Sequence, residues 1–232
     1  IPHRHPRRVP RTEHPRGRRA CPHPAGVAGA DGPLRRGDVG NAEAVARGEV
    51  PAGQALRRDG AKAGDEIWVS GTLGTAALAL AFRQGRVELE QLEAAACLPA
   101  LYVPQPRVGL GLELRGIASA AIDVSDGLLA DLGHILEQSG AGAEIHFAAL
   151  PLHEVTRRHI HLDVAKNCVL AGGDDYELCF TAPAERHAEL LALANKLALP
   201  LSCIGRIVGA KGLALLDGQG QPMLVEAKGF DH

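Results

Sequence analysis

Aromatic residues are scarce in this sequence of 232 residues, at 3% of the chain, and the formal net charge is only -2. Because bases stack on aromatic rings and phosphates attract net positive charge, this composition gives no support to nucleic acid as a partner. No apolar run reaches the roughly 18 residues that a membrane-spanning helix needs, so we expect no membrane partner. The 5 cysteines contain no CxxC pair. They fit neither a disulfide framework nor a structural zinc site and favour the cytoplasm.

Several common catalytic motifs are also missing. The sequence contains no Walker A motif, no glycine-rich kinase loop, no GxSxG and no HExxH. The marks of P-loop enzymes, protein kinases, serine hydrolases and zinc peptidases are therefore lacking. The histidine pair His159 and His161 follows two arginines, and we interpret it as a solvated basic patch rather than a metal site.

The N-terminal segment differs in kind from the rest. Within residues 1–47, the first 24 residues are rich in Arg, Pro and His and have no helical or strand periodicity, and the only methionine of the chain is Met223. We expect an aberrant or disordered leader in a fragment of a longer protein. A tail that binds nucleic acid or an anionic surface, and GC-rich DNA translated out of frame, are the alternatives.

From residue 48 onward, turn residues and periodic apolar residues alternate. Residues 48–61 read as an inter-domain junction, and 62–232 as a domain in which strands and helices follow one another. We expect strands at 66–70, 117–124, 144–148, 176–181, 202–208, 213–216 and 222–227, and helices at 75–84, 108–115, 127–139 and 184–198. The segment 101–107 is a connection, and 152–164 is ambiguous, with a helix as one reading. This order predicts an α+β fold, a layered mixed sheet with helices and with hairpin strands late in the chain.

Two sequence patterns predict which side chains are buried. Tyr176, Leu178 and Phe180 alternate with polar or smaller residues, which predicts a half-buried strand. In the last helix, one apolar face is expected to carry Leu190, Leu191, Ala194, Leu197 and Ala198.

The first acidic loop joins a buried strand to a helix. It contains Asp123, Ser125, Asp126 and Gly127. Two carboxylates three residues apart can bind Mg²⁺, while the hydroxyl and the N-terminal amides of the helix face phosphate oxygens. The alternative is local, with Ser125 or Asp126 serving only as a helix cap.

The second acidic loop, GGDDYE, spans residues 172–177 and precedes a strand. Its glycines allow close backbone approach, and three acids within four residues favour a nearby cation or a cationic substrate. A solvated turn is the alternative. Together the two loops suit phosphoryl transfer, which needs oxygen ligands for metal ions and little covalent work by the protein.

The stretches GEVPAGQALRRDGAKAGDEIWVSGTLGTAALAL, IDVSDGLLADLGHIL, LAGGDDYELCFTAP, CIGRI and KGFDH, in this order, resemble the bacterial thiamine-monophosphate kinase family. The resemblance covers residues 48–232 and implies the fold of the aminoimidazole ribonucleotide synthetase superfamily, in its C-terminal part. It further implies transfer of the γ-phosphate of ATP onto thiamine monophosphate, with Mg²⁺, to give thiamine diphosphate.

The resemblance also implies roles for single residues. Asp123 and Asp126 are then magnesium ligands, Arg58 and Ser125 contact ATP, and Asp174 and Phe230 contact thiamine monophosphate. The family's N-terminal acidic loops, which supply further magnesium ligands and the homodimer contacts, are not legible in this chain. We therefore expect little or no kinase activity from it and doubt that it dimerises. A non-catalytic remnant that binds thiamine phosphate, and a sister enzyme such as selenide water dikinase or the hydrogenase maturation factor for the nickel centre, are the alternatives.

Overall fold

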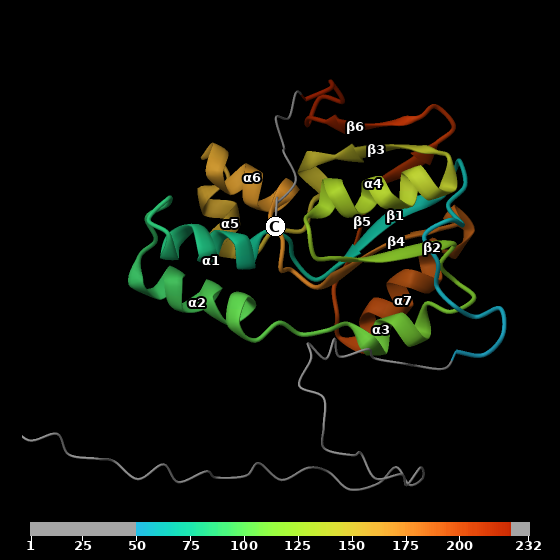
Figure 1. Ribbon diagram of the computed structural model, residues 1–232, viewed down its shortest axis with the longest axis horizontal. Coiled ribbons are helices and arrows are strands. Elements are labelled where there is room, and N and C mark those ends of the chain that lie inside the picture. The colour runs from blue at the N-terminus through green and yellow to red at the C-terminus, as the bar shows by residue number, and fades with distance from the viewer. Residues whose placement is uncertain (1–49, 224–232) are drawn as a thin grey trace, which may run out of the picture. The chain divides into compact units, whose positions relative to one another are not determined.

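The computed structural model describes residues 50–223. In this part of the chain a six-stranded sheet carries helices on both faces and beyond one end, as Figure 1 shows. The α+β fold with a layered mixed sheet, expected from the sequence, is confirmed. The leader expected over residues 1–47 and the substrate contact expected at Phe230 lie outside the described residues.

The strands are β1 (Glu66–Ser70), β2 (Ala120–Val124), β3 (Gly142–His146), β4 (Glu177–Ala182), β5 (Leu201–Val208) and β6 (Gly212–Leu216). Their order in the sheet is β2-β4-β1-β5-β3-β6. Neighbouring strands are antiparallel except β3 and β6, which are parallel. β5 and β6 do not form a hairpin with each other, because β3 lies between them. The turn expected at 217–220 is present, since Asp217 donates its N–H to the carbonyl of Gln221 at 2.9 Å. Beyond β6 the described residues hold a single bridge, between Leu216 and Pro222, at the start of the strand expected over 222–227.

The helices are α1 (Thr75–Arg83), α2 (Gln91–Tyr102), α3 (Val108–Glu113), α4 (Leu128–Ser139), α5 (Glu154–His159), α6 (Asp163–Ala171) and α7 (His187–Leu197). The ambiguous stretch over 152–164 holds α5 and the start of α6. No helix was expected at α2, where Pro99 stands inside the helix. Proline in a helix interior removes a backbone hydrogen bond, so its presence argued against this helix. No helix in residues 50–223 is long and apolar enough to cross a membrane.

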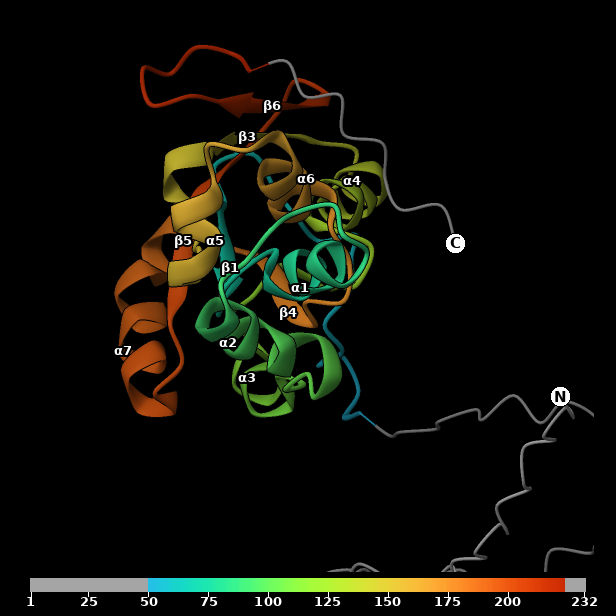
Figure 2. The same ribbon diagram turned by 90° about the vertical axis from the view of Figure 1, so that its left-hand side faces the viewer.

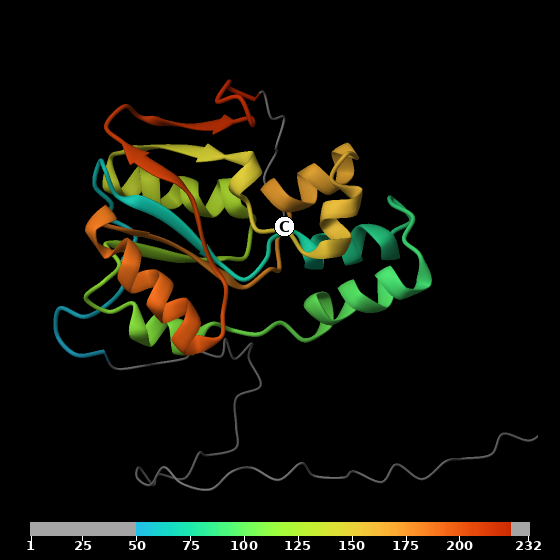
Figure 3. The ribbon, with the colours of Figure 1, turned by 180° about the vertical axis from the view of Figure 1, so that it is seen from behind.

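The two faces of the sheet are covered by different helices. α4 lies in front of the sheet in Figure 1 and α7 in front of it in Figure 3. α4 buries Leu128, Leu132 and Ile135 in one core cluster, which includes Ile67 of β1. α3 and α7 contribute to a second cluster around Trp68 and Phe180. The apolar stripe of α4 is thus used as its sequence spacing predicts.

Two burial expectations are wrong. Strand β4 is buried on both faces, because it lies between β2 and β1 under helices on each side. Its polar Thr181 is buried beside the hydroxyl of Ser119, at 2.7 Å, so the polar alternation did not mark a solvent face. In α7, Leu193 is buried while Leu191 is 45% exposed, because the packed face is turned toward Leu190 and Leu193.

The four helices α1, α2, α5 and α6 lie beyond one end of the sheet, as Figures 1 and 2 show. They share a third apolar cluster that includes Leu78, Cys97, Val155 and Cys168. The junction segment is joined to the edge strand β2, where Ala121 donates its N–H to the carbonyl of Arg57 at 2.8 Å. This contact places Arg57 beside the first half of β2.

Candidate active site

The two acidic loops lie side by side at one end of the sheet. Strands β2 and β4 are antiparallel, and Val124 at the end of β2 pairs with Glu177 at the start of β4. Asp174 donates its N–H to the carbonyl of Ser125 at 3.0 Å, and Tyr176 donates its N–H to the carbonyl of Val124 at 2.8 Å. The sequence predicted each loop singly, and the sheet register joins them.

Two glycines make this approach of the loops feasible. A Cβ atom on Gly127, where φ is +108°, would lie 2.7 Å from the backbone of Ala171. A Cβ atom on Gly173 would lie 2.4 Å from the carbonyl oxygen of Ser125. The sequence predicted that the glycines of the second loop allow another part of the backbone to come close, and in the structure that part is the first loop. Any larger residue at Gly173 would push the loops apart.

Asp131 holds the first loop in shape. Its carboxylate accepts the N–H groups of Ser125 and Asp126, each at 3.0 Å, and its side chain is only 2% exposed. Burial raises the pKa of the Asp131 carboxyl, against the two N–H donors that lower it. This residue was missed by sequence reasoning. The sequence signal that could have identified Asp131 is an acidic residue in the first turn of α4, next to the apolar stripe of that helix.

A cavity of about 490 Å³ opens beside this loop. We call it the Arg58 cavity, since Arg58, Asp123, Tyr176 and Arg107 are among the residues that line it. Arg58 and Asp123 are exposed, so both can meet a ligand from solution. The structure thus brings together the expected ATP contact Arg58 and the expected magnesium ligand Asp123, with Ser125 and Asp126 in the adjoining turn.

The described residues include no group of three or more histidine, cysteine, aspartate or glutamate side chains that could hold a metal ion. Asp123 and Asp126 therefore offer at most a partial set of protein ligands. That set fits Mg²⁺, which is usually bound through one or two carboxylates together with substrate phosphates and water.

The backbone of the second loop is strained. Asp174 has φ of 68° and Tyr176 has φ of 51°, a region that residues with a side chain seldom adopt. The hydroxyl of Tyr176 donates to the Asp174 carboxylate at 3.3 Å. Strain of this kind collects at functional sites, where surrounding contacts hold it in place.

The other acids of this loop have structural partners. Asp175 accepts the N–H of Gly74 at 2.7 Å, just before α1. Glu177 is 5% exposed and accepts from Arg107, at 2.7 and 2.5 Å, and from the hydroxyl of Ser70 at 2.6 Å. The sequence predicted a cation near these crowded acids, and for Glu177 that cation is Arg107. The hydrogen bond and charge of Glu177 raise the pKa of Arg107.

Burial also raises the pKa of Asp175 to about 8, with further contributions from the negative charges of Glu177 and Asp174. The N–H of Gly74 acts in the opposite direction. This carboxyl group is therefore largely protonated at neutral pH.

A second cavity of about 370 Å³ lies on the other side of this loop. We call it the Thr75 cavity, and its lining includes Thr72, Thr75, His153, Asp175 and Arg107. Its apolar wall comes from α2 and from the segment that follows α2. Arg107 and the GGDDYE loop border both cavities.

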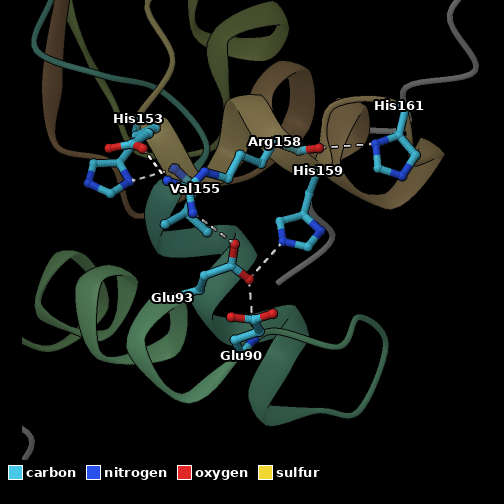
Figure 4. Close-up of polar contacts among 8 residues, drawn as sticks. Glu90, Glu93, His153, Val155, Arg158, His159 and His161 are labelled. Carbon is cyan, nitrogen blue, oxygen red and sulfur yellow. Dashed lines mark hydrogen bonds and ion pairs between the residues drawn. The ribbon is translucent and has the colours of Figure 1, made fainter.

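Polar contacts tie the wall helix α2 to α5, as Figure 4 shows. His159 lies 3.0 Å from the Glu93 carboxylate, and Arg158 lies 3.6 Å from the same group. The hydrogen bond with His159, together with the N–H of Glu90, lowers the pKa of Glu93. The other histidine of this pair, His161, bonds to the carbonyl of Arg158 at 3.1 Å. His159 thus serves to join two helices.

Three comparisons with known proteins bear on this site. The family model described as "AIR synthase related protein, C-terminal domain" matches residues 62–218. Thiamine-monophosphate kinases from Salmonella typhimurium and Escherichia coli are 43% and 42% identical to this chain over 187 residues. Each alignment covers 80% of this chain and 57% of the relative, so the chain spans little more than half the length of these relatives.

Solved structures give the same picture. A thiamine-monophosphate kinase from Stenotrophomonas maltophilia has a TM-score of 0.67 and 48% identity, over 74% of this chain and 55% of that chain. AaThiL, solved in complex with AMPPCP and TMP, has a TM-score of 0.63 and 31% identity, over 76% and 54%. Escherichia coli HypE, a hydrogenase maturation protein, has a TM-score of 0.54 at 20% identity, over 75% and 52%, which shows the shared fold alone.

Proposed function

Because this chain belongs to the family of AIR synthase related proteins, C-terminal domain, we propose that it is the C-terminal part of a thiamine-monophosphate kinase. In the proposed reaction the γ-phosphoryl group of ATP moves to the phosphate of thiamine monophosphate. The bond from the γ-phosphorus to the bridging oxygen of ADP breaks, and a bond to an oxygen of thiamine monophosphate forms. The products are ADP and thiamine diphosphate.

The observation that carries this proposal is the junction of the two acidic loops beside the Arg58 cavity, in a sequence 43% identical to a kinase of this kind. Phosphoryl transfer depends on positioning and on charge neutralisation, and needs no protein nucleophile. The loops offer carboxylates, a hydroxyl and backbone N–H groups in one place. The complex of AaThiL with AMPPCP and TMP supports ATP and thiamine monophosphate as the ligands.

We propose Asp123 and Asp126 as the magnesium ligands of this domain. Bound Mg²⁺ would supply neutralisation of the charge on the phosphate oxygens. Asp131 acts as a positioning residue, because it fixes the backbone N–H groups of Ser125 and Asp126. Removing its carboxylate would free the turn that carries both ligands.

The other roles are those that the family resemblance implies. We propose that Arg58 and Ser125 contact ATP, with the Arg58 guanidinium pairing with phosphate oxygens. Asp174 and Phe230 are proposed to contact thiamine monophosphate. The substrates are small molecules, and the near-neutral charge and the scarce aromatic residues support no role for nucleic acid. Cys97, Cys168, Cys179 and Cys203 are free thiols, which supports a cytoplasmic protein.

The test is calorimetric binding of AMPPCP with and without Mg²⁺ to the 232-residue chain and two variants. Asp123→Asn should weaken Mg²⁺-dependent binding at least tenfold, because it removes a charged oxygen ligand. Asp163→Asn is the matched control, since Asp163 is an exposed acid that forms an ion pair with Lys166 at 3.0 Å. It should leave the Kd unchanged. Equal Kd values for the wild type and Asp123→Asn would contradict the proposal, and so would binding that does not depend on Mg²⁺.

A further inference from the structure

The guanidinium group of Arg107 is held in one orientation beside both cavities. Its Nε and Nη2 atoms donate to the two oxygens of the Glu177 carboxylate, at 2.7 and 2.5 Å. Two parallel hydrogen bonds fix the plane of a guanidinium group as well as its position. Arg107 stands in the segment between α2 and α3, whose course Figure 1 shows.

The carboxylate that holds Arg107 is itself fixed. Glu177 is buried and also accepts from the hydroxyl of Ser70 at 2.6 Å, while that hydroxyl accepts the N–H of Leu178 at 2.9 Å. A Cβ atom on Gly71, where φ is +59°, would lie 1.9 Å from a carboxylate oxygen of Glu177, so glycine leaves room for this group. Arg107 is therefore attached to a buried network.

The pair with Glu177 uses only one edge of the guanidinium group. The N–H groups of Nη1 and the second N–H of Nη2 remain as donors. Within residues 50–223 the Nη1 atom has no hydrogen-bond partner, and it is not among the buried polar atoms that lack one. These donors are therefore fixed in direction and open to a ligand from solution.

Arg107 is placed where the two cavities adjoin. Arg58 lines only the Arg58 cavity, and His153 lines only the Thr75 cavity. Among the described residues, Arg107 is thus the one arginine or lysine that lines both. A fixed guanidinium edge matches the oxygens of a phosphate better than any other common ligand group.

The neighbouring charges are balanced around Arg107. Burial raises the pKa of Asp175 to about 8, so this acid carries little charge at neutral pH. Glu177 is already neutralised by Arg107 itself. On the other side, Asp123 is a proposed ligand of Mg²⁺, which adds positive charge beside bound phosphates. A phosphate at Arg107 therefore meets no unbalanced carboxylate.

We propose that Arg107 donates hydrogen bonds to the γ-phosphate of ATP, the group that is transferred. This inference rests on the proposed function, which assigns the nucleotide to the Arg58 cavity. The acceptor must reach the γ-phosphate from outside the nucleotide site, so this phosphate belongs where the Arg58 cavity adjoins the next one. Arg107 makes no covalent bond and neutralises charge on the oxygens that are transferred, from a position that needs no rearrangement.

Arg107→Lys separates the phosphate contact from the ion pair. Lysine keeps a cation beside Glu177, so the Tm should fall less than in Arg107→Leu. Its ammonium group lacks the planar fork that can hold a carboxylate on one edge and a phosphate on the other. Arg206→Lys is the matched control, the same change in a pair with Glu144 at the far edge of the sheet.

Binding is measured by calorimetry with three probes: Mg²⁺ with AMPPCP, Mg²⁺ with ADP, and thiamine monophosphate. Arg107→Lys should weaken AMPPCP about tenfold, the loss of a hydrogen bond to a charged group, and leave the other two unchanged. Only AMPPCP carries a γ-phosphate. Arg206→Lys should change none of the three.

Other results overturn the inference. Equal weakening of AMPPCP and ADP would show that the substitution acts on the structure of the site as a whole. A loss confined to thiamine monophosphate would place Arg107 at the acceptor phosphate. Unchanged binding of all three probes would show that Arg107 serves only as the partner of Glu177.

A measurement on the wild type does not depend on the folding of a variant. The Nε–H signal of Arg107 in the NMR spectrum, assigned through its own side-chain carbons, should shift on adding AMPPCP with Mg²⁺ and stay in place on adding ADP with Mg²⁺. The same response to both nucleotides would contradict a contact with the γ-phosphate.

Failure of the proposed function gives a different result. A wild-type chain that binds neither nucleotide with Mg²⁺ would remove the kinase proposal and this inference together. A chain that binds AMPPCP in a way that depends on Asp123 but not on Arg107 would keep the kinase proposal and remove the inference alone.

Discussion

At the scale of single residues, Asp175 is the most perturbed carboxyl group of the site. Burial raises its pKa to about 8, from an ordinary value of 3.8. The folded state therefore holds a proton on this group over a pH range in which the unfolded chain has released it. Between about pH 4 and pH 8, stability from this group falls as the pH rises.

Asp175→Asn removes this dependence, because the amide cannot ionise and its oxygen can still accept the N–H of Gly74. The Tm of the variant minus that of the wild type should therefore increase from about pH 4 to about pH 8 and then level off. Thermal unfolding in buffers that contain a chelator, across pH 4 to 9, measures the difference. A constant difference over this range would show that Asp175 ionises normally.

The residues of the first loop could be predicted from the sequence because two acids and a serine follow one another closely at the end of a strand. Asp123 is the penultimate residue of strand β2 and Ser125 and Asp126 follow in the turn before α4, as that reasoning predicted, whereas their position beside the second loop comes from the sheet register. Arg107 could not be found in this way, because its partner Glu177 is 70 residues distant and only the fold brings them together.

At the scale of elements, the segment between α2 and α3 is attached to the start of β4 through one ion pair. Glu177 is 5% exposed, and the Arg107 side chain is 25% exposed. The segment carries residues that line both cavities. The ion pair between Arg107 and Glu177 therefore holds in place the segment that separates the Arg58 cavity from the Thr75 cavity.

Arg107→Leu should lower the free energy of unfolding by about 3 kcal/mol, because it leaves the buried carboxylate of Glu177 without its cation. Urea unfolding measures the change. Arg206→Leu is the control, since Arg206 pairs with Glu144 at the surface, where the side chains are 66% and 33% exposed. Its loss should be at most about 1 kcal/mol. Equal losses in the two variants would mean that the Arg107 pair contributes no more than a surface pair.

Elements with a clear period could be predicted from the sequence, and pairings between distant strands could not. The amphipathic pattern of α4 predicted where this helix begins and ends to within one residue, and the alternating residues of β1 predicted that strand. The insertion of β3 between β5 and β6 depends on contacts across the sheet, which no local pattern encodes. The prediction that β4 is half-buried was wrong because its polar residues are buried with partners. Glu177 pairs with Arg107, and Thr181 pairs with Ser119.

At the scale of the whole molecule, the sheet brings three distant segments to one end. The ends of β1 and β2 and the start of β4 meet there, through the pairs of β4 with both other strands. The α+β class followed from the order of the sequence elements. The presence of two cavities, divided by one loop and by Arg107, required the three-dimensional structure.

The most direct test of a shared site for both substrates is an amide NMR titration of the 232-residue chain with Mg²⁺, AMPPCP and thiamine monophosphate. We expect the largest shifts at residues 123–127 on adding AMPPCP with Mg²⁺, and at 173–176 on adding thiamine monophosphate. The far edge of the sheet, at β3 and β6, should not respond. Shifts confined to that edge, or none in either loop, would contradict the assignment of this end of the sheet as the active site.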